Sequence, residues 1–327
     1  SKKESAVEPI ALDVHVHQVP IDLDRLGVLP DARWDEAQGH LEIDGRHIAL
    51  QPLFKPERLI AWMDENAVRR AWISVPPPVY RQHLDAERAE GWARYLNDGL
   101  SALSAQRPDH FEALMHLPVE HPELCVAIVR QWLGSGISRF AMPAGAGPRV
   151  SLSDRAYEPL WSLLSEAEAF LFLHPAEAGF DARLAPFYLQ NTIGNPIETA
   201  IAAAHLVFGR ILERYRGLKI CLAHCGGATA MVAGRMSRSL ATERPGVDAQ
   251  MMAPAKALQQ LWVDCIAHSA DAVAQAATVF GADHIVFGSD WPFPMGLPKP
   301  HDQLAALPSP SRRRVFLENP AALMRGK

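Results

Sequence analysis

The stretch that decides the fold is Ile10-Ala11-Leu12-Asp13-Val14-His15-Val16-His17, close to the start of the chain. It alternates apolar residues with the polar residues Asp13, His15 and His17, a pattern typical of a strand. Side chains two positions apart on a strand point to the same face, so His15 and His17 can bind one metal ion together. Taken alone, the pattern fits two strand-end histidines that bond to backbone equally well.

Seven more β-rich apolar runs follow, which gives candidate strands at 10–17, 70–75, 111–118, 137–143, 170–175, 219–225, 261–267 and 284–290. Segments with the apolar spacing of helices lie between them, at 56–66, 122–133, 157–169 and 196–215. Strands that alternate with helices predict a parallel sheet, and eight such repeats close a (β/α)8 barrel. No Gly-x-Gly-x-x-Gly motif follows the first strand, so a dinucleotide site is not expected. We therefore predict an α/β protein with a TIM-type (β/α)8 barrel.

The chain length of 327 residues suits one barrel with insertions, because such a barrel needs about 250 residues. Residues 18–55 do not fit the repeat, and Asp44-Gly45 within them is typical of a two-residue hairpin turn. Loops that follow barrel strands lie on the catalytic face. We expect a single domain over residues 1–327, in which the insertion 18–55 covers the active site.

The composition and net charge limit which kinds of molecule the protein is expected to bind. Hydrophobic residues make up 48% and charged residues 21% of the chain, enough to bury a sizeable core. The 32 Lys and Arg against 37 Asp and Glu give a net charge of −5, which argues against a nucleic-acid partner. No apolar run is long enough to cross a membrane or to form a signal peptide, and 4 cysteines give no disulfide framework. We expect a cytoplasmic protein that acts on a small molecule.

Three later strands end in residues of the same chemistry. The fifth ends in His174, the sixth in His224 and the eighth in Asp290. The carboxyl ends of barrel strands share one face, so these side chains are expected near His15 and His17. Imidazole nitrogens and a carboxylate suit zinc, manganese or iron. Independent core histidines have no reason to gather at these strand ends, so the pattern predicts a catalytic metal site.

The chain resembles the amidohydrolase superfamily, most closely the branch named for α-amino-β-carboxymuconate-ε-semialdehyde decarboxylase, which also contains γ-resorcylate and 5-carboxyvanillate decarboxylases. The resemblance runs almost end to end, and its specific motifs lie at 13–17, 174–175, 194–199, 223–227, 288–294 and 318–321. It implies a deformed barrel with one divalent metal ion, zinc before manganese, and no organic cofactor. A homodimer is a further implication of the resemblance.

The resemblance also implies roles for single residues. By position, the metal ligands would be His15, His17, His174 and Asp290. His224 would be the acid–base residue beside the metal-bound water, and Asp290 would share in proton transfer. No Lys ends the fourth strand, so the bridging carbamate of two-metal amidohydrolases is not expected.

The substrate-binding positions depart from the family pattern. In muconate-semialdehyde decarboxylases, an Arg before the first helix and a Trp after the fifth strand lie in the substrate pocket. By position these fall on His47, next to Arg46, and on Asn191. We take Arg46, His47 and Asn191 as candidate substrate-binding residues.

Other polar residues near strand ends admit both a structural and a functional interpretation. Asp264, within the seventh strand, can orient a ligand histidine. His116, His268 and Cys225 can take part in the site or simply pack against it.

The sequence therefore predicts a metal-dependent, non-oxidative decarboxylase of a small carboxylate substrate, aromatic or unsaturated, with a hydroxyl, amino or carbonyl group near its carboxylate. A metal-dependent hydrolase of a lactone, ester, amide or C–C bond is the alternative, because both reactions use the same residues. A barrel that has lost activity and serves as a binding module is the third possibility.

Overall fold

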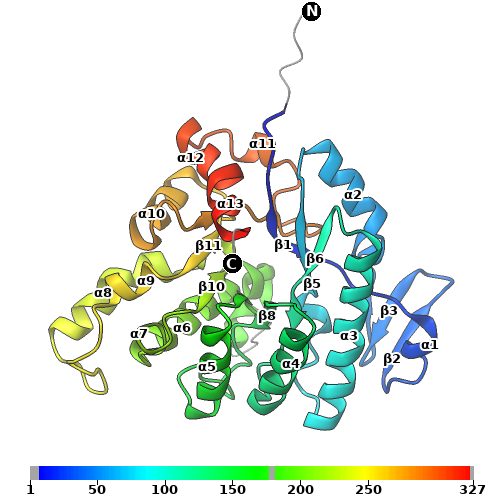
Figure 1. Cartoon of the computed structure of the whole chain (residues 1–327), viewed down its shortest axis with the longest axis horizontal. Coiled ribbons are helices and arrows are strands. Elements are labelled where there is room, and N and C mark those ends of the chain that lie inside the picture. Colours follow the sequence, from blue (N-terminus) through cyan, green and yellow to red (C-terminus); the bar gives the residue numbers. More distant parts are fainter. Residues whose placement is uncertain (1–6, 177–180, 325–327) are drawn as a thin grey trace, which may run out of the picture.

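The computed structural model describes residues 7–176 and 181–324. The helices are α1 (Leu23–Leu26), α2 (Pro56–Glu65), α3 (Ala86–Gln106), α4 (Pro122–Gly134), α5 (Glu158–Glu166), α6 (Asn195–Phe208), α7 (Ile211–Arg214), α8 (Thr229–Ala241), α9 (Pro254–Leu258), α10 (Ala270–Phe280), α11 (Pro300–Gln303), α12 (Ser309–Arg313) and α13 (Asn319–Met324). The strands are β1 (Asp13–His17), β2 (Ala32–Asp35), β3 (His40–Ile43), β4 (Arg46–Ile48), β5 (Ala71–Ser74), β6 (Phe111–Ala113), β7 (Met115–His116), β8 (Arg139–Pro143), β9 (Phe170–His174), β10 (Lys219–Leu222), β11 (Trp262–Asp264) and β12 (Ile285–Val286). From α2 to β12, one or two α-helices separate each strand from the next, except that β6 leads almost directly into β7 (Figure 1).

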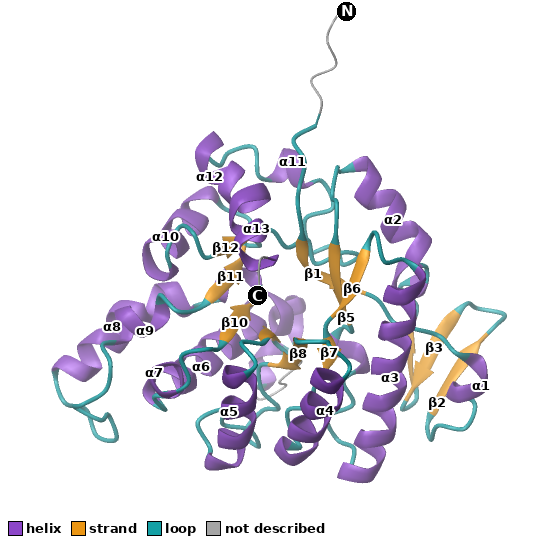
Figure 2. Ribbon diagram, viewed as in Figure 1, coloured by secondary structure: helices purple, strands orange, loops and turns teal. Residues whose placement is uncertain are grey.

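The parallel strands lie at the centre of the molecule, and helices surround them (Figure 2). They form one sheet in the order β1-β5-β6 and a second in the order β12-β11-β10-β9-β8-β7. Only Leu114 separates β6 from β7, so the chain passes from one sheet to the other there. At the opposite seam, the N–H of Val14 donates to the carbonyl of Phe287 (3.1 Å), and that of His17 to the carbonyl of Trp291 (2.9 Å).

The regular strands of the described residues therefore do not form the single closed ladder that the sequence predicts. The carboxylate of Asp13 provides a physical reason at the seam between β1 and β12. Its Oδ1 accepts hydrogen bonds from the N–H groups of His15 (3.1 Å) and Ser289 (3.0 Å). The pairing of β1 with β5 also shifts its register between Asp13 and Val16. A side chain thus takes the place of regular ladder bonds next to the strand ends.

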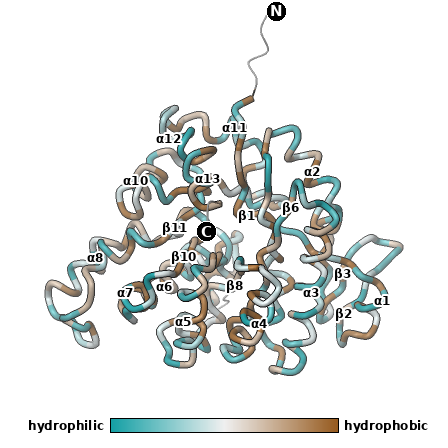
Figure 3. The backbone as a smooth tube through the Cα atoms, viewed as in Figure 1, coloured by the Kyte–Doolittle hydropathy of each residue, from teal (hydrophilic) through white to brown (hydrophobic). Residues whose placement is uncertain are grey.

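Apolar side chains fill both faces of the parallel strands. The inner face carries a buried cluster that includes Leu12, Val14, Phe172 and Val286. The outer face packs against helices, and all five residues of β9 are buried. Hydrophilic residues recur along the outer helices (Figure 3). No helix in the described part of the chain is both long and apolar enough to cross a membrane.

Residues 18–55 contribute a small antiparallel sheet, β2-β3-β4, at the edge of the molecule (Figure 1). The turn between β3 and β4 has φ values of 52° at Asp44 and 75° at Gly45, the positive values that a two-residue hairpin turn needs. Arg81 fixes this turn to the loop after β5, because its guanidinium donates to both carboxylate oxygens of Asp44 at 2.6 and 2.9 Å.

Candidate metal site

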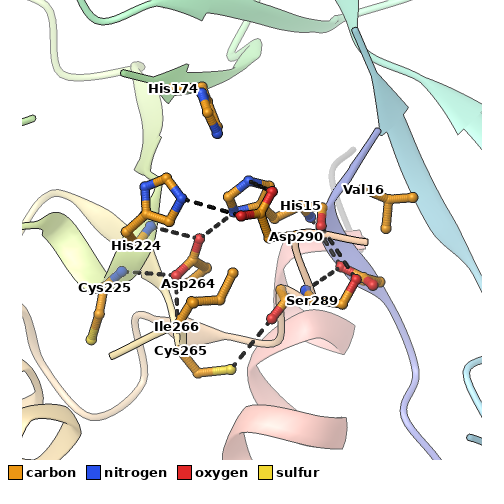
Figure 4. Close-up of polar contacts among 12 residues, drawn as sticks. His15, Val16, His174, His224, Cys225, Asp264, Cys265, Ile266, Ser289 and Asp290 are labelled. Atoms are coloured by element: carbon orange, nitrogen blue, oxygen red, sulfur yellow. Dashed lines mark hydrogen bonds and ion pairs between the residues drawn. The ribbon is translucent and has the colours of Figure 1, made fainter. Parts of the chain in front are cut away.

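Three imidazoles and one carboxylate converge at the carboxyl ends of the central strands. Figure 4 labels His15, His174 and Asp290 of this group. His15 and His17 belong to β1, His174 ends β9 and Asp290 follows β12. One nitrogen or oxygen atom from each lies within 4.8 Å of the others, and all four residues are buried. The Oδ1 of Asp290 is 3.2 Å from the Nε2 atoms of both His15 and His17. The structure thus brings together the four residues that the family resemblance implies as metal ligands.

The hydrogen bonds of the ring nitrogens show that these histidines can bind a cation. The Nδ1 of His15 donates to Asp264 (2.7 Å), and that of His174 donates to the carbonyl oxygen of the next residue (2.7 Å). The Nδ1 of His17 lies 3.3 Å from the hydroxyl of Ser74. A proton on Nδ1 leaves a lone pair on Nε2. The three buried Nε2 atoms have no hydrogen-bond partner among the described residues, so the donor set fits a divalent ion.

Asp264 connects the cluster to its neighbour His224. Besides the ring of His15, its carboxylate accepts hydrogen bonds from the backbone N–H groups of His224 (2.9 Å), Cys225 (2.8 Å) and Ile266 (2.9 Å). Burial opposes the ionisation of Asp264, but the hydrogen bond and the charge of His15 outweigh it and lower the pKa of this carboxyl. The ionised Asp264 therefore orients one ligand ring and one backbone turn at once.

That backbone turn places His224 in an uncommon conformation. His224 and Cys225 have φ values of 53° and 57°, in the left-handed region that residues other than glycine rarely adopt. The two N–H bonds to Asp264 hold them there. The Nε2 of His224 consequently lies 3.6 Å from the Oδ2 of Asp290, and its side chain is 18% exposed, whereas those of His15 and His17 are fully buried. His224 is thus placed to contact a bound molecule.

Burial and charge set the protonation of the cluster. Burial lowers the pKa of His17 and of His174, which favours neutral rings. Burial opposes the charge of Asp290, but His15 and the other histidines hold the pKa of its carboxyl well below the usual range. Burial also opposes a charge on His15, yet Asp290 and Asp264 raise its pKa to about 10. A cation has to displace this proton, so its affinity is expected to fall as pH falls.

Two cavities adjoin the cluster. The smaller, about 110 Å³, is lined by His17, His174, His224 and Asp290 among other residues. The larger, about 380 Å³, is also lined by His224. A molecule in either cavity can therefore meet His224, and one in the smaller cavity also meets the ligand set.

The structure separates the three candidate substrate-binding residues. Asn191 lines both cavities, whereas Arg46 and His47 line neither. Both lie on β4 at the edge of the molecule, where the Nδ1 of His47 is 2.9 Å from the Nε2 of His40. In the described chain, the residues around these two cavities all lie outside 18–55. Pairing with β3 holds this part of the insertion in the antiparallel sheet.

Several residues around the cavities were not singled out from the sequence, namely Asn195, Phe293 and Met295. Asn195 lies in the 194–199 motif and Phe293 in the 288–294 motif, so the motifs were a usable signal for both. Met295 lies in the loop beyond the second motif, and no periodic pattern marks such a loop. The side chains that line the cavities depend on loop conformation, which the spacing of residues does not reveal.

Gly288 permits the close approach of β1 and β11, and we expect Gly288→Ala to disturb the cluster. A β-carbon there would lie 2.8 Å from the Cβ of His15 and 2.9 Å from the Cβ of Asp264. We expect the free energy of unfolding to fall by about 1–3 kcal/mol and metal affinity to fall roughly 10- to 100-fold. Urea unfolding and competition with a chelator measure the two effects.

Gly234→Ala is the matched control, because no atom outside its own turn of α8 lies within 4 Å of the added carbon. A helix gains up to about 1 kcal/mol from this exchange, and metal affinity should not change. Wild-type metal affinity in Gly288→Ala would contradict the expectation that this contact positions His15.

Glu198 makes the stability of the protein depend on pH. Its buried carboxyl accepts a hydrogen bond from the N–H of Ala176, and burial raises its pKa from 4.5 to about 7. Between these values the folded state keeps a proton that the unfolded state has lost, so stability falls as pH rises through this window. Glu198→Gln, which removes this titration, should be about 1–3 kcal/mol more stable than the wild type near pH 8.

Urea unfolding near pH 8 and near pH 5 tests this expectation, because the advantage of Glu198→Gln should shrink at the lower pH. Glu65→Gln, at an exposed position, is the control and should show no such dependence. An equal advantage at both pH values would contradict the assignment to Glu198.

The comparisons with known proteins agree with this site. The amidohydrolase family model matches residues 12–326, so the chain belongs to the amidohydrolase family, as the resemblance in its motifs implies. The chain is 27% identical over 346 residues to 2-amino-3-carboxymuconate-6-semialdehyde decarboxylase of Caenorhabditis elegans, covering 87% of this chain and 86% of that protein. It is 26% identical over 308 residues to gamma-resorcylate decarboxylase of Rhodococcus jostii, and the match covers 87% of this chain and 88% of that protein.

Solved structures share the fold. The 5-carboxyvanillate decarboxylase of Sphingomonas paucimobilis matches with a TM-score of 0.81 and 18% identity, over 98% of this chain and all of that one (100%). A dihydroxybenzoic acid decarboxylase of Polaromonas sp. JS666, solved with bound manganese and the inhibitor 2-nitroresorcinol, matches with a TM-score of 0.76 and 20% identity over 97% of both chains. The fold is therefore that of a TIM barrel, although its described parallel strands pair as two separate sheets.

Proposed function

We propose that this protein is a metal-dependent, non-oxidative decarboxylase of a small aromatic or unsaturated carboxylate that bears a hydroxyl or amino group. The observation that carries the proposal is the position of His224, a proton-transfer residue that contacts both the cavities and the Asp290 of the ligand set. The relatives named above are decarboxylases, which favours this reaction over hydrolysis on the same scaffold.

We infer that one divalent ion is bound by His15, His17, His174 and Asp290. Three imidazole nitrogens and one carboxylate oxygen suit zinc, and manganese is the alternative. When bound, the ion supplies Lewis acidity that stabilises negative charge on substrate oxygens. No Lys or Arg is among the described residues that line the two cavities, so no cationic side chain there holds the substrate carboxylate.

His224 supplies the proton that the reaction needs. Decarboxylation breaks the bond between the carboxylate and its neighbouring carbon, and a new C–H bond takes its place. An imidazole can both accept and donate a proton, which suits it to general acid catalysis. The Nε2 of His224 lies 3.6 Å from the Oδ2 of Asp290. A hydroxyl or amino group on the substrate donates electrons to the carbon that receives the proton.

Release of CO2 in D2O tests the proposal. The metal-loaded protein is incubated with 2,6-dihydroxybenzoate, 5-carboxyvanillate, salicylate and 2-amino-3-carboxymuconate semialdehyde. We expect one CO2 per product from at least one of them, with one deuterium at the carbon that carried the carboxylate. A product that gains oxygen from H₂¹⁸O without CO2 release would instead make the protein a hydrolase. Elemental analysis of a preparation never exposed to chelator identifies the metal.

A further inference from the structure

The larger cavity has no part in the chemistry described above. It shares the wall of the smaller cavity at Asn191, Asn195, His224 and Met295. A molecule that is bound beside the cluster can therefore extend past His224 into the larger cavity. What the larger cavity accepts is set by its size and by the chemistry of its walls.

The two volumes differ more than threefold, about 110 Å³ against about 380 Å³. An apolar cavity of about 150 Å³ is enough to hold benzene. The smaller cavity, at about 110 Å³, is below this figure, so a ring whose carboxylate lies at the cluster extends toward the shared wall. The larger, at about 380 Å³, is more than twice this figure, so a substrate with one ring would leave most of it filled with water.

The walls of the larger cavity select for an uncharged group. Its lining includes the apolar residues Pro196, Ala230, Met231, Ile266, Ala267, Ala272 and Met295. The described residues around it include no Asp, Glu, Lys or Arg, so a second ionic group has no counter-charge there. Thr192, His268 and Gln275 also line it and can hydrogen-bond a neutral oxygen or nitrogen.

Asn195 marks the junction of the two cavities. It is only 8% exposed, and its Oδ1 has no hydrogen-bond partner among the described residues. A buried amide oxygen without a partner costs about 1–3 kcal/mol. A hydroxyl or amino group of a bound molecule at this junction would supply the missing donor.

We propose that the natural substrate has two parts: a carboxylated ring in the smaller cavity, and a second, uncharged and largely apolar group of at least phenyl size in the larger. A hydroxyl or amino group of the substrate bonds to the Oδ1 of Asn195 at the junction. This inference rests on the proposed function and names its substrate class.

Binding of analogues that cannot react tests the inference on the metal-loaded wild type. In 2-nitrophenol a nitro group replaces the carboxylate, so the compound and its 4-phenyl and 5-phenyl derivatives are compared by calorimetry. We expect at least one phenyl derivative to bind at least about tenfold more tightly than 2-nitrophenol, a difference of about 1.4 kcal/mol. Equal affinities for all three compounds would overturn the inference.

A matched pair of variants locates the bound group. Ala272→Phe fills the larger cavity from α10, whereas Ala274→Phe adds the same side chain at an exposed position of that helix. We expect the affinity ratio between the phenyl derivative and 2-nitrophenol to drop about tenfold in Ala272→Phe and to stay unchanged in Ala274→Phe. Ala230→Phe fills the same cavity from α8 if Ala272→Phe does not fold. An unchanged ratio in the folded cavity-filling variant would contradict the assignment to this cavity.

The outcomes separate the two proposals. Tighter binding of a phenyl derivative, without CO2 release from any carboxylate of matching size, would keep the two-part site and reject the decarboxylase. If carboxylates with one ring release CO2 and the phenyl group brings no gain in affinity, the decarboxylase assignment stands and the two-part substrate is rejected.

Discussion

Asp290→Ala is expected to lose both the bound metal and turnover while the protein stays folded. Asp290 is the only carboxylate of the cluster, and its Oδ1 lies 3.2 Å from two of the ligand nitrogens. Loss of a residue that merely supports a ligand costs roughly 10- to 100-fold in metal affinity, so loss of a ligand should cost at least about 100-fold. Turnover should fall at least about 1,000-fold, since the proton path through His224 loses its neighbour as well.

Elemental analysis after dialysis and circular dichroism check this expectation together. Asp109→Ala, at an exposed position, is the control and should keep both metal and activity. Full metal content in Asp290→Ala would mean that this carboxylate is not a ligand. A collapsed circular-dichroism spectrum would mean instead that the ion holds the fold.

His224→Ala should lower kcat about 100- to 10,000-fold, the usual range for the loss of a general acid. Its metal content should remain that of the wild type, because the ligand set is complete without His224. KM should change far less than kcat, since the side chain acts on the reacting carbon. Steady-state kinetics and elemental analysis on the same preparation measure both quantities.

His110→Ala is the matched control, because His110 precedes β6 and therefore lies at the opposite end of the strands. Its kinetics should equal those of the wild type. If His224→Ala lost metal together with activity, His224 would be a ligand. A wild-type kcat in His224→Ala would show that His224 takes no part in proton transfer.

The positions of the strands could be predicted because each strand is a short apolar run between polar segments. Every one of the eight predicted runs contains a strand, although the run 111–118 is divided into β6 and β7. The helices predicted at 56–66 and 122–133 agree with α2 and α4 to within one residue at each end. The run 196–215 is divided as well, because Arg210 adopts a left-handed conformation with φ of 59°.

The long helix α3 was not predicted, although Asp85 caps its start by accepting a hydrogen bond from the N–H of Arg88. Its many alanine and glycine residues make the spacing of its larger apolar residues hard to recognise. Gly99 is explained only by the fold, because a β-carbon there would lie 2.4 Å from the ring of Pro20. Contacts of this kind join distant parts of the chain, and local patterns do not report them.

The gathering of the cluster could be predicted because its residues lie in a strand or soon after one. The distinction between the four ligands and His224 came from the family resemblance. Arg46 and His47 could not be placed, because their hairpin is fixed by a contact between Arg81 and Asp44. Family position alone suggested the cavity for them, and this contact between loops keeps them on the antiparallel sheet at the edge of the molecule.

The four hydrogen bonds to Asp264 divide the site into two parts that tolerate amino-acid substitution differently. One carboxylate holds both the His15 ring and the His224 turn, so neither can move without the other. Among the described residues, those from Asn191 to Pro196 on the cavity wall make no hydrogen bond to that carboxylate, so they can be exchanged without moving the His15 ring or the His224 turn. New substrate preference in this scaffold should therefore arise by exchange on that wall, with Asp264 left in place.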